Sequence, residues 1–434
     1  MFRMPAGGCG MQSKYWVTLT GEFWYATAEL ACCQRERSMA GMFSPVDYHW
    51  MKLAARLGAR GIGCVEPNPP VGCVIVKESL ENVLQHSVSD KQQPTDDFTP
   101  EQGEILGLGH HRRFGGSHAE VEALQAAGYS ARGATVYVTL EPCNHQGKTP
   151  ACTRTLIRAG VRRVVIARKD PHPQAGGGAE ELRKAGIQVD FLPGCREAQL
   201  LAAPFVTRVT EKRAWTVVKW AQTIDGRSAT RSGESQWISG ERSRRLVHRW
   251  RGRVDAIMTA RGTVEKDDPM LTARGVHIRR RALRVVVDSG LSISPECKLV
   301  RTAAEYPLLI LTKEETLREN SGRAEKLIRA GTEIKGLPGG VGGVDIKEAL
   351  SFLAKEKNVT RVMVEAGPGL TGTLAEQNLI DEARVFIAPI LLADDRAKPV
   401  AGGLVRQRLI DANRFELINS RTVGDDLLVI YTRR

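Results

Sequence analysis

The sequence predicts a mixed α/β protein built from two domains. Its 434 residues exceed the length of one ordinary domain. Short runs rich in β-branched residues, such as 71–76 and 135–141, alternate with amphipathic segments that end at glycine. This alternation pauses at a basic connector, 206–214, and then resumes without any internal repeat. We therefore expect one α/β domain at 42–209 and a second at 210–434, each with a core of its own.

Residues 1–41 predict no element of either domain. They show neither helical nor strand periodicity, and they lack the basic, apolar and small-residue order of a signal peptide. Met39 and Met42 both qualify as starting residues. We expect an N-terminal extension that is disordered or an artefact of the assigned start.

The first domain is expected to begin with a helix. Ser44 is a suitable N-cap, Pro45 suits the first helical position, and the helical pattern ends at Gly58. A buried strand at 71–76 follows, and the polar, aperiodic residues 79–103 predict a long surface loop or insertion. The other expected elements are a helix at 118–128, a strand at 135–141, a helix capped by Thr149 that ends at Gly160, and strands at 162–168 and 187–193 with a helix between them.

The second domain repeats the alternation of apolar runs and amphipathic segments. Strands are expected at 215–221, 255–260, 283–289, 307–312 and 361–367, and a further apolar run follows at 383–392. Helices are expected at 240–254, 323–331, 345–358 and 371–380.

Composition narrows the class of partner. The net charge of +13 suits anionic partners, which include nucleic acids and phosphorylated metabolites. No run of five like charges occurs, and the few aromatic residues do not interleave with basic ones, so nucleic acid is disfavoured. Nine cysteines without a secretory pattern indicate reduced thiols in the cytoplasm. No apolar run approaches the roughly 18 residues that span a bilayer.

A candidate zinc site lies in the first domain, at His118, Glu120, Cys143 and Cys152. Catalytic zinc keeps three protein ligands and leaves the fourth tetrahedral position for water; one His and two Cys fit that count. Both cysteines lie near an expected helix start, where the helix dipole favours thiolate. Glu120 can take a proton from the activated water and pass it to a leaving amine. The simpler alternative is a pair of buried cysteines beside a turn.

The order of these residues, His-x-Glu and then Pro-Cys…Cys, matches the signature of nucleobase deaminases. In that signature two residues separate the cysteines, whereas eight separate Cys143 from Cys152. The longer spacing disfavours the deaminases that act on transfer RNA or edit DNA bases.

A glycine-rich stretch marks the second domain. Gly367, Gly369 and Gly372 fit the spacing G-x-G-x-x-G between a strand and a helix, which presents backbone N–H groups to a pyrophosphate. No clear acidic residue ends the next strand, and the motif lies late in its domain. A dinucleotide-binding Rossmann domain is therefore disfavoured.

Three stretches of the first domain, "NPPVGCVIV", "HAEVEAL" and "EPCNHQGKTPAC", resemble the deaminase domain of the bifunctional deaminase/reductase family of riboflavin biosynthesis. The resemblance implies a cytidine-deaminase-like fold, zinc at His118, Cys143 and Cys152, and Glu120 as the proton shuttle. It also implies substrate contacts from Asn68, His111, His145, Lys148 and Thr149. Asn144 and Ala151 depart from the usual Ser and Pro of the family, but neither position supplies a ligand.

The stretches "VVKWAQTIDGRSA", "SGESQWIS" and "TVEKDDPMLTAR" resemble the reductase domain of the same family, which has a dihydrofolate-reductase-like fold. The resemblance implies NADP contacts from Ala221, Trp237, Thr263, Asp267, Ser289, Gly367, Pro368, Gly369, Leu370, Thr371, Gly372 and Thr373. It implies substrate contacts from Ser235, Arg251, Leu271, Arg274 and Glu365. Arg251 and Arg274 suit a phosphate, because guanidinium forks match its oxygens. Thr223 replaces a common Ser and keeps the hydroxyl.

The resemblance implies two successive reactions. The first domain would deaminate 2,5-diamino-6-(5-phosphoribosylamino)pyrimidin-4(3H)-one with one zinc ion per chain. The second would use NADPH to reduce the ribosyl group, giving 5-amino-6-(5-phosphoribitylamino)uracil. We thus expect a phosphorylated pyrimidine as partner, and neither nucleic acid nor membrane; a homo-oligomer is compatible with the sequence. NADPH rather than NADH follows from the resemblance alone.

Three other interpretations fit the sequence less well. A zinc nucleoside or RNA deaminase fused to an unrelated NADP reductase is the main alternative, but it would show a basic face and the short cysteine spacing. A reductase with a decayed deaminase half is disfavoured because all four zinc-site residues are present. A zinc-stabilised binding module would need a fourth protein ligand.

Overall fold

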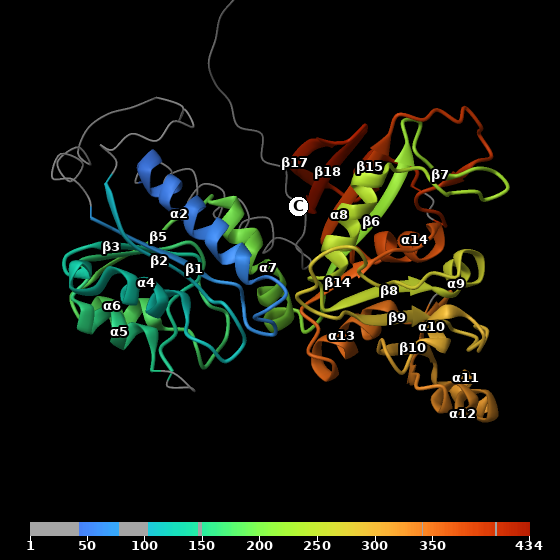
Figure 1. Cartoon of the computed structure of the whole chain (residues 1–434), viewed down its shortest axis with the longest axis horizontal. Helices are drawn as coiled ribbons and strands as arrows, with labels where there is room; N and C mark the ends of the chain where they lie inside the picture. The colour runs from blue at the N-terminus through green and yellow to red at the C-terminus, as the bar shows by residue number, and fades with distance from the viewer. Residues whose placement is uncertain (1–42, 78–102, 146–149, 341, 404–405) are drawn as a thin grey trace, which may run out of the picture. The chain divides into compact units, whose positions relative to one another are not determined.

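The computed structural model describes residues 43–77, 103–145, 150–340, 342–403 and 406–434 (Figure 1). The N-terminal extension lies outside these ranges, and so does the expected loop at 79–103 except for Gly103. Within the described residues no helix is both long and apolar enough to cross a membrane.

The first domain is built on a five-stranded sheet. Its strands are β1 (Gly72–Lys77), β2 (Glu104–His110), β3 (Thr135–Val138), β4 (Arg163–Ile166) and β5 (Gln188–Phe191), in the order β2-β1-β3-β4-β5. β1 pairs antiparallel with both β2 and β3, while β3, β4 and β5 run parallel. Burial on both faces explains why β1, β3 and β4 read as continuous apolar runs rather than alternating ones.

Helices cover both faces of this sheet (Figure 1). α2 (Pro45–Gly58) and α7 (Arg196–Thr210) lie on one face, and α4 (Ala119–Ala127), α5 (Cys152–Ala159) and α6 (Gly178–Lys184) lie on the other. Short 3-10 turns, η1 (Ala59–Gly61) and η3 (Gly128–Ala131), follow α2 and α4. The sequence predicted α2 and α4 closely, since each has a distinct start signal and ends at a glycine.

Strand β2 was not among the expected elements. Its sequence "EILGLGH" contains two glycines, which ordinarily weaken a strand. Here they allow helix α4 to approach: a Cβ on Gly107 would lie 2.1 Å from Ala123 O, and one on Gly109 would lie 2.1 Å from Ala119 O. The glycines are therefore a consequence of helix–sheet packing.

The second domain is built on a nine-stranded sheet of order β11-β10-β9-β8-β14-β6-β15-β18-β17. All neighbours from β11 to β15 are parallel, and β15, β18 and β17 pair antiparallel at one edge. The strands are β6 (Trp215–Thr223), β8 (Ala256–Ala260), β9 (Leu283–Val287), β10 (Leu308–Lys313), β11 (Glu333–Leu337), β14 (Arg361–Val364), β15 (Glu382–Ala388), β17 (Phe415–Val423) and β18 (Asp426–Arg433).

Alternate residues of the central strands pack into two cores on opposite faces of this sheet. Val285 and Met258 join one core, whereas Val286 and Ile257 join the other. Helices α13 (Ile346–Glu356) and α14 (Pro368–Glu376) contribute to the first core, and α9 (Arg261–Asp267), α10 (Lys298–Arg301) and α12 (Ser321–Arg329) to the second. α8 (Glu241–Arg251) packs Val247 against Phe386 and Leu428.

Smaller elements complete the domain. α11 (Glu314–Glu319) precedes α12, the 3-10 turn η4 (Leu409–Asp411) precedes β17, and β12 (Gly339–Gly340) pairs with β13 (Gly343–Val344). β7 (Arg227–Ala229) pairs antiparallel with β16 (Lys398–Pro399).

Two local expectations were wrong. The basic connector at 206–214 is helical as far as Thr210, because α7 buries Phe205 and Thr207 in continuity with its earlier turns. Helix α5 begins at Cys152 with Ala151 as its N-cap, not at Pro150 after Thr149. Its first N–H groups instead meet the preceding loop, since Thr153 N–H donates to Cys143 O and Cys152 N–H to Cys143 Sγ. The proposed boundary at 209/210 stays a prediction.

Candidate functional site

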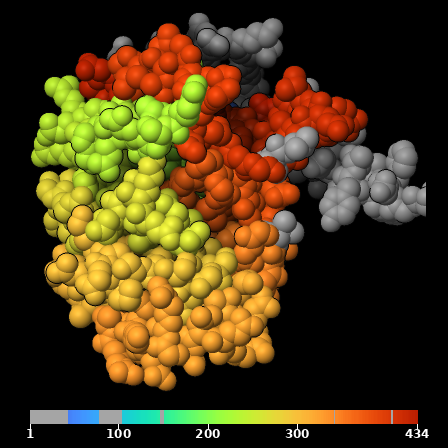
Figure 2. Space-filling view, turned by 90° about the vertical axis from the view of Figure 1, so that its right-hand side faces the viewer, coloured from blue at the N-terminus to red at the C-terminus, as the bar shows by residue number. Residues whose placement is uncertain are grey.

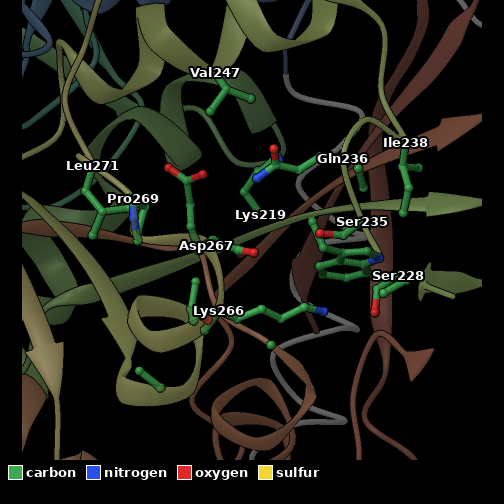
Figure 3. Close-up of a pocket in the computed structure, with 18 of the residues that line it drawn as sticks. Lys219, Ser228, Ser235, Gln236, Ile238, Val247, Lys266, Asp267, Pro269 and Leu271 are labelled. Carbon is green, nitrogen blue, oxygen red and sulfur yellow. The ribbon is translucent and has the colours of Figure 1, made fainter. Parts of the chain in front are cut away.

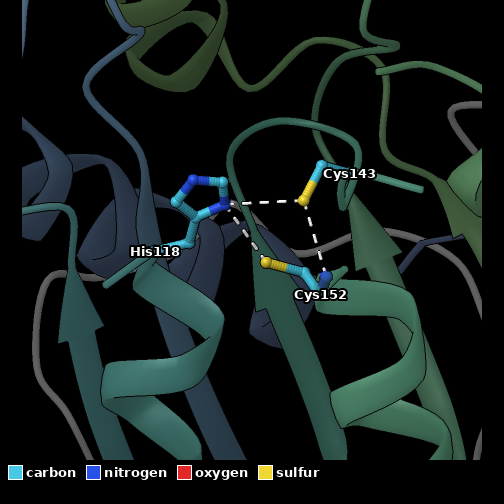
Figure 4. Close-up of side chains that lie close together, drawn as sticks. All are labelled: His118, Cys143 and Cys152. Carbon is cyan, nitrogen blue, oxygen red and sulfur yellow. Dashed lines mark hydrogen bonds between the residues drawn. The ribbon is translucent and has the colours of Figure 1, made fainter. Parts of the chain in front are cut away.

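Three side chains of the first domain converge as a metal-binding cluster (Figure 4). The Sγ of Cys143 lies 3.5 Å from His118 Nδ1, and the Sγ of Cys152 lies 3.3 Å from the same nitrogen. All three donor atoms lie within 4.8 Å of one another. Tetrahedral zinc with ordinary Zn–S and Zn–N lengths separates such atoms by about 3.5 Å. The donor set therefore fits zinc in both chemistry and spacing.

Helix starts position two of the three donors. His118 is the N-cap of α4, and Cys152 is the first residue of α5. Cys143 lies in the loop between β3 and α5, where it accepts the Cys152 N–H at 3.5 Å. Hydrogen bonding from the Cys152 thiol and from His118 lowers the pKa of Cys143 to about 4. Cys143 is thus favoured as a thiolate, the form that binds metal, whereas the hydrogen bond to Cys143 and burial raise the pKa of Cys152.

Glu120 lies beside the cluster in the first turn of α4. Its side chain is buried, and burial raises the pKa of the carboxyl group. A carboxyl group beside the donors but outside their set is positioned for proton transfer.

Asn68 and His111 form the second part of this site. His111 Nδ1 lies 2.9 Å from Ser117 O, so Nδ1 carries the proton and donates it to that carbonyl. Nε2 is then the acceptor for the Asn68 amide at 3.3 Å. This chain of bonds fixes which way the Asn68 amide faces. His145 is exposed, and Lys148 and Thr149 lie outside the described residues.

The second domain contains a cavity of about 1040 Å³ at the carboxyl ends of β6, β8 and β14. Figure 3 shows Lys219, Ser235, Asp267 and Leu271 around it, contributed by different segments. Figure 2 shows the face of the chain on which yellow-green, gold and red segments, distant in sequence, lie together. Of the residues predicted to bind NADP or substrate, the cavity is lined by Ala221, Ser235, Trp237, Arg251, Thr263, Asp267, Leu271, Arg274, Glu365, Gly367, Pro368, Gly369 and Leu370.

Four predicted NADP contacts do not line the cavity. Thr371 and Gly372 are buried in α14, and the Thr373 hydroxyl donates to Gly369 O at 3.2 Å. The Ser289 hydroxyl accepts the Val344 N–H at 3.0 Å. A motif that spans a helix start includes positions that face the core, which explains Thr371 and Gly372.

Arg251 and Glu365 form a two-bond ion pair inside the cavity. Arg251 Nε and one terminal nitrogen lie 2.7 and 2.8 Å from the two Glu365 oxygens, and the other terminal nitrogen donates to Thr272 O at 3.2 Å. Although burial alone raises the pKa of Glu365, attraction to Arg251 lowers it to about 2. The guanidinium group of Arg251 thus binds a carboxylate. Arg274 is exposed, and within the described residues its guanidinium group donates only to the Thr272 hydroxyl.

Sequence reasoning missed several side chains of this cavity, and three of them carry charge or can titrate next to the predicted residues. Lys219 lies on β6 within the run "WTVVKWA", where a lone charge in an apolar strand is a usable signal. Burial lowers the pKa of its amine. Arg244 places its guanidinium 4.5 Å from the exposed Trp237 ring. His248 lines the cavity from α8, and nothing in its sequence context distinguishes it from an ordinary helical residue.

Comparison with known proteins is consistent with both sites. The family model described as "RibD C-terminal domain" matches residues 214–429, and "Cytidine and deoxycytidylate deaminase zinc-binding region" matches 45–168. Curated relatives include the riboflavin biosynthesis protein RibD of Aquifex aeolicus, 36% identical over 90% of this chain and 100% of that protein, and that of Escherichia coli, 37% identical over 88% and 98%.

Solved structures agree. RibD of Acinetobacter baumannii superposes with a TM-score of 0.70 at 30% identity, over 90% of this chain and 99% of that one. The diaminohydroxyphosphoribosylaminopyrimidine deaminase/5-amino-6-(5-phosphoribosylamino)uracil reductase of Thermotoga maritima gives 0.68, also at 30% identity, with the same coverage. The chain therefore belongs to the RibD family, the bifunctional enzymes of riboflavin biosynthesis in which a zinc-dependent deaminase domain precedes an NADPH-dependent reductase domain.

Proposed function

We propose that this chain deaminates 2,5-diamino-6-(5-phosphoribosylamino)pyrimidin-4(3H)-one and then reduces the ribosyl group of the product to ribityl. The Thermotoga maritima relative, a deaminase of a diaminohydroxyphosphoribosylaminopyrimidine, supports this substrate class. The observation that carries the proposal is the presence of both sites in one chain: three zinc donors beside a buried carboxyl group, and a separate cavity that joins Lys219 with the Arg251–Glu365 pair. The alternative, a nucleoside or RNA deaminase fused to an unrelated reductase, gains no support from either site.

In the deaminase site, His118, Cys143 and Cys152 would hold zinc. A bound zinc ion would act as a Lewis acid and lower the pKa of its bound water to about 7. Glu120, beside the donors, would accept the proton of the attacking water and deliver it to the departing amino group, so that ammonia leaves. Asn68, oriented by His111, would recognise the polar edge of the pyrimidine. His145, Lys148 and Thr149 remain proposed contacts of the ribose phosphate.

In the reductase site, the chain holds the sugar and the cofactor against each other. NADPH supplies the hydride, and the protein supplies position and charge. Lys219 and Glu365 face the same cavity, and we propose that the protonated Lys219 side chain donates a proton to the sugar as it is reduced and is left as the neutral amine. Arg274, with its free donors, is the better partner for the phosphate, and Arg251 holds Glu365 in place.

The remaining contacts stay proposals. NADPH is assigned to Ala221, Trp237, Thr263, Asp267, Ser289 and the segment 367–373, and substrate also to Ser235 and Leu271. The partner we propose is a phosphorylated pyrimidine rather than nucleic acid. We also propose a cytoplasmic location, which the six described cysteines support because all are free.

A coupled assay tests this function. Ammonia release and NADPH loss are followed together on the diaminopyrimidinone, with Glu120→Gln and Lys219→Met as matched variants. We expect Glu120→Gln to stop both signals with the diamino substrate yet to reduce the deaminated product normally, and Lys219→Met to release ammonia without consuming NADPH. NADPH loss without prior ammonia release, or ammonia release that a zinc chelator leaves unchanged, would overturn the assignment.

A further inference from the structure

His248 occupies an unusual place at the substrate end of the reductase cavity. Its Nδ1 lies 3.1 Å from Thr272 O and 3.2 Å from Arg274 N. One ring nitrogen therefore faces both a carbonyl, which needs a donor, and an amide N–H, which needs an acceptor. It can satisfy only one of them in a given protonation state.

The other partners of Thr272 O and of the Arg274 N–H indicate whether His248 Nδ1 carries a proton. Thr272 O also accepts an N–H of Arg251 at 3.2 Å, so it has a donor without His248. Arg274 N–H has no other acceptor among the residues that the structure describes. If Nδ1 accepts, both backbone groups are paired; if Nδ1 carries a proton, the Arg274 N–H loses its partner.

The charged groups around the ring favour the same state. Arg251 on α8 and Arg274 on the loop oppose a positive charge on His248, while Glu365, after β14, favours it but is already paired with Arg251. Burial and these two arginines lower the pKa of His248. The imidazole is therefore neutral near pH 7, with Nδ1 free to accept.

The loop held in this way carries residues of the cavity. Leu271 lines the cavity in a left-handed conformation, with φ of 49°, and Arg274 projects its guanidinium three residues later. A backbone bond to Arg274 fixes where that side chain starts. We propose that His248 is a positioning residue of the reductase. Its neutral Nδ1 accepts the Arg274 N–H and so fixes where the Arg274 side chain lies for binding the phosphate. This inference rests on the proposed function, since it takes the substrate phosphate as the ligand of Arg274.

The test compares three variants. His248→Leu removes the acceptor, His248→Ala removes it without added bulk, and His248→Asn places an amide oxygen near the position of Nδ1 but cannot titrate. Loss of one hydrogen bond weakens binding by roughly 3- to 10-fold. We expect His248→Leu and His248→Ala to raise the KM for the deaminated pyrimidine phosphate by that factor, with kcat and the KM for NADPH within about twofold of wild type. His248→Asn should restore the KM to within about twofold.

A pH series gives a readout that a merely structural role would not move. Because the pKa of His248 is lowered from its ordinary value, the wild-type imidazole takes up a proton only in the acidic range below that value. In that range the KM of the wild type for the pyrimidine phosphate should rise relative to the KM of His248→Asn at the same pH. The substrate phosphate also titrates in this range, with a second pKa of about 6, and affects both proteins equally. The ratio of the wild-type KM to the His248→Asn KM therefore reports on His248 alone. Ammonia release should be equal in all variants.

The outcomes separate the two proposals. If wild type does not consume NADPH with this substrate, the proposed function fails. If wild type is active and His248→Ala keeps the wild-type KM, or if His248→Asn behaves like His248→Leu, then His248 does not act through an accepting Nδ1. A variant that raises the KM for NADPH equally would also overturn the proposal, because the loop would then have lost its general shape.

Discussion

Gly372 offers a sharp test of how the glycine-rich helix α14 is held. A Cβ added at this position would lie 1.8 Å from Gly402 O and 2.9 Å from Gly402 C, so Gly372→Ala would create a backbone clash. Real Cβ contacts are at least 3.0 Å, so the helix start and the Gly402 segment must separate by about 1.2 Å. That movement would break the bond from Gly402 N–H to Pro368 O, now 3.1 Å long.

The magnitude follows from three contributions. Overpacking costs about 1–3 kcal/mol, and the lost hydrogen bond about 0.5–1.5 kcal/mol. The gain in helix propensity from Gly to Ala returns up to about 1 kcal/mol. The reductase domain should therefore lose roughly 1–3 kcal/mol of unfolding free energy. NADPH should also bind more weakly, because Gly367 to Leu370 line the cavity from the same helix start.

The effect is measured by urea unfolding, with the loss of NADPH oxidation as the readout. With a slope of about 2–3 kcal/mol per M, the midpoint should fall by roughly 0.3–1.5 M. Gly369→Ala is the matched control, since the same helix offers open space at that position. We expect this control to keep or raise the midpoint, and both variants to release ammonia normally. A Gly372→Ala variant with wild-type midpoint and wild-type NADPH affinity would refute the packing argument.

Three further outcomes concern individual residues of the second domain. Asp381→Asn should destabilise it by about 3–5 kcal/mol in urea unfolding, because Asp381 bonds Arg213 at 2.6 and 2.8 Å and both side chains are buried; replacing the pair together, as Asp381→Leu with Arg213→Met, should cost less than the two single changes combined. Ala393→Gly should raise the stability by about 0.5–1 kcal/mol, since Ala393 has φ of 51°; a lower melting temperature would contradict this. The pKa of Glu365, near 2 in the fold against an ordinary 4.5, means that its ionised form contributes stability above about pH 4.5 and that this contribution disappears as the pH falls toward 2. The stability difference between wild type and Glu365→Gln should thus be constant down to about pH 5 and shrink below it.

The zinc cluster could be predicted from sequence because its chemistry needs few residue types. His118, Cys143 and Cys152 are close in sequence, and their order already specifies the site. The exact start of α5 could not be predicted, since its first N–H groups are satisfied by Cys143 rather than by the suitable cap at Thr149. The contact between the first N–H groups of α5 and Cys143 determines the helix start, and the capping pattern in the sequence does not.

The reductase cavity was predicted less completely. Residues in quoted motifs, such as Ser235 and Trp237, line the cavity as expected. The pairing of Arg251 with Glu365 could not be read from sequence, because 114 positions separate them and only the sheet brings them together. His248 carries no local signal for the same reason: its role depends on a loop that follows a different element.

The strand β2 illustrates a different limit. Glycine lowers strand propensity, and no periodic pattern in "EILGLGH" outweighs it. The reason for Gly107 and Gly109 lies in α4, which packs against them through its backbone. Propensity describes a strand by itself, whereas this strand is explained by its neighbour.

The contrast between Arg251, held by Glu365, and Arg274, open to solvent, has a consequence for inhibitor design. Pockets that reject incomplete ligands strongly do so because the ligand leaves a buried polar group unpaired. Here the buried guanidinium already has its partner, and the exposed one can return to water. A neutral mimic of the ribitylamino-uracil without its phosphate should therefore lose only a modest part of its affinity, and it would cross membranes that exclude the natural dianion.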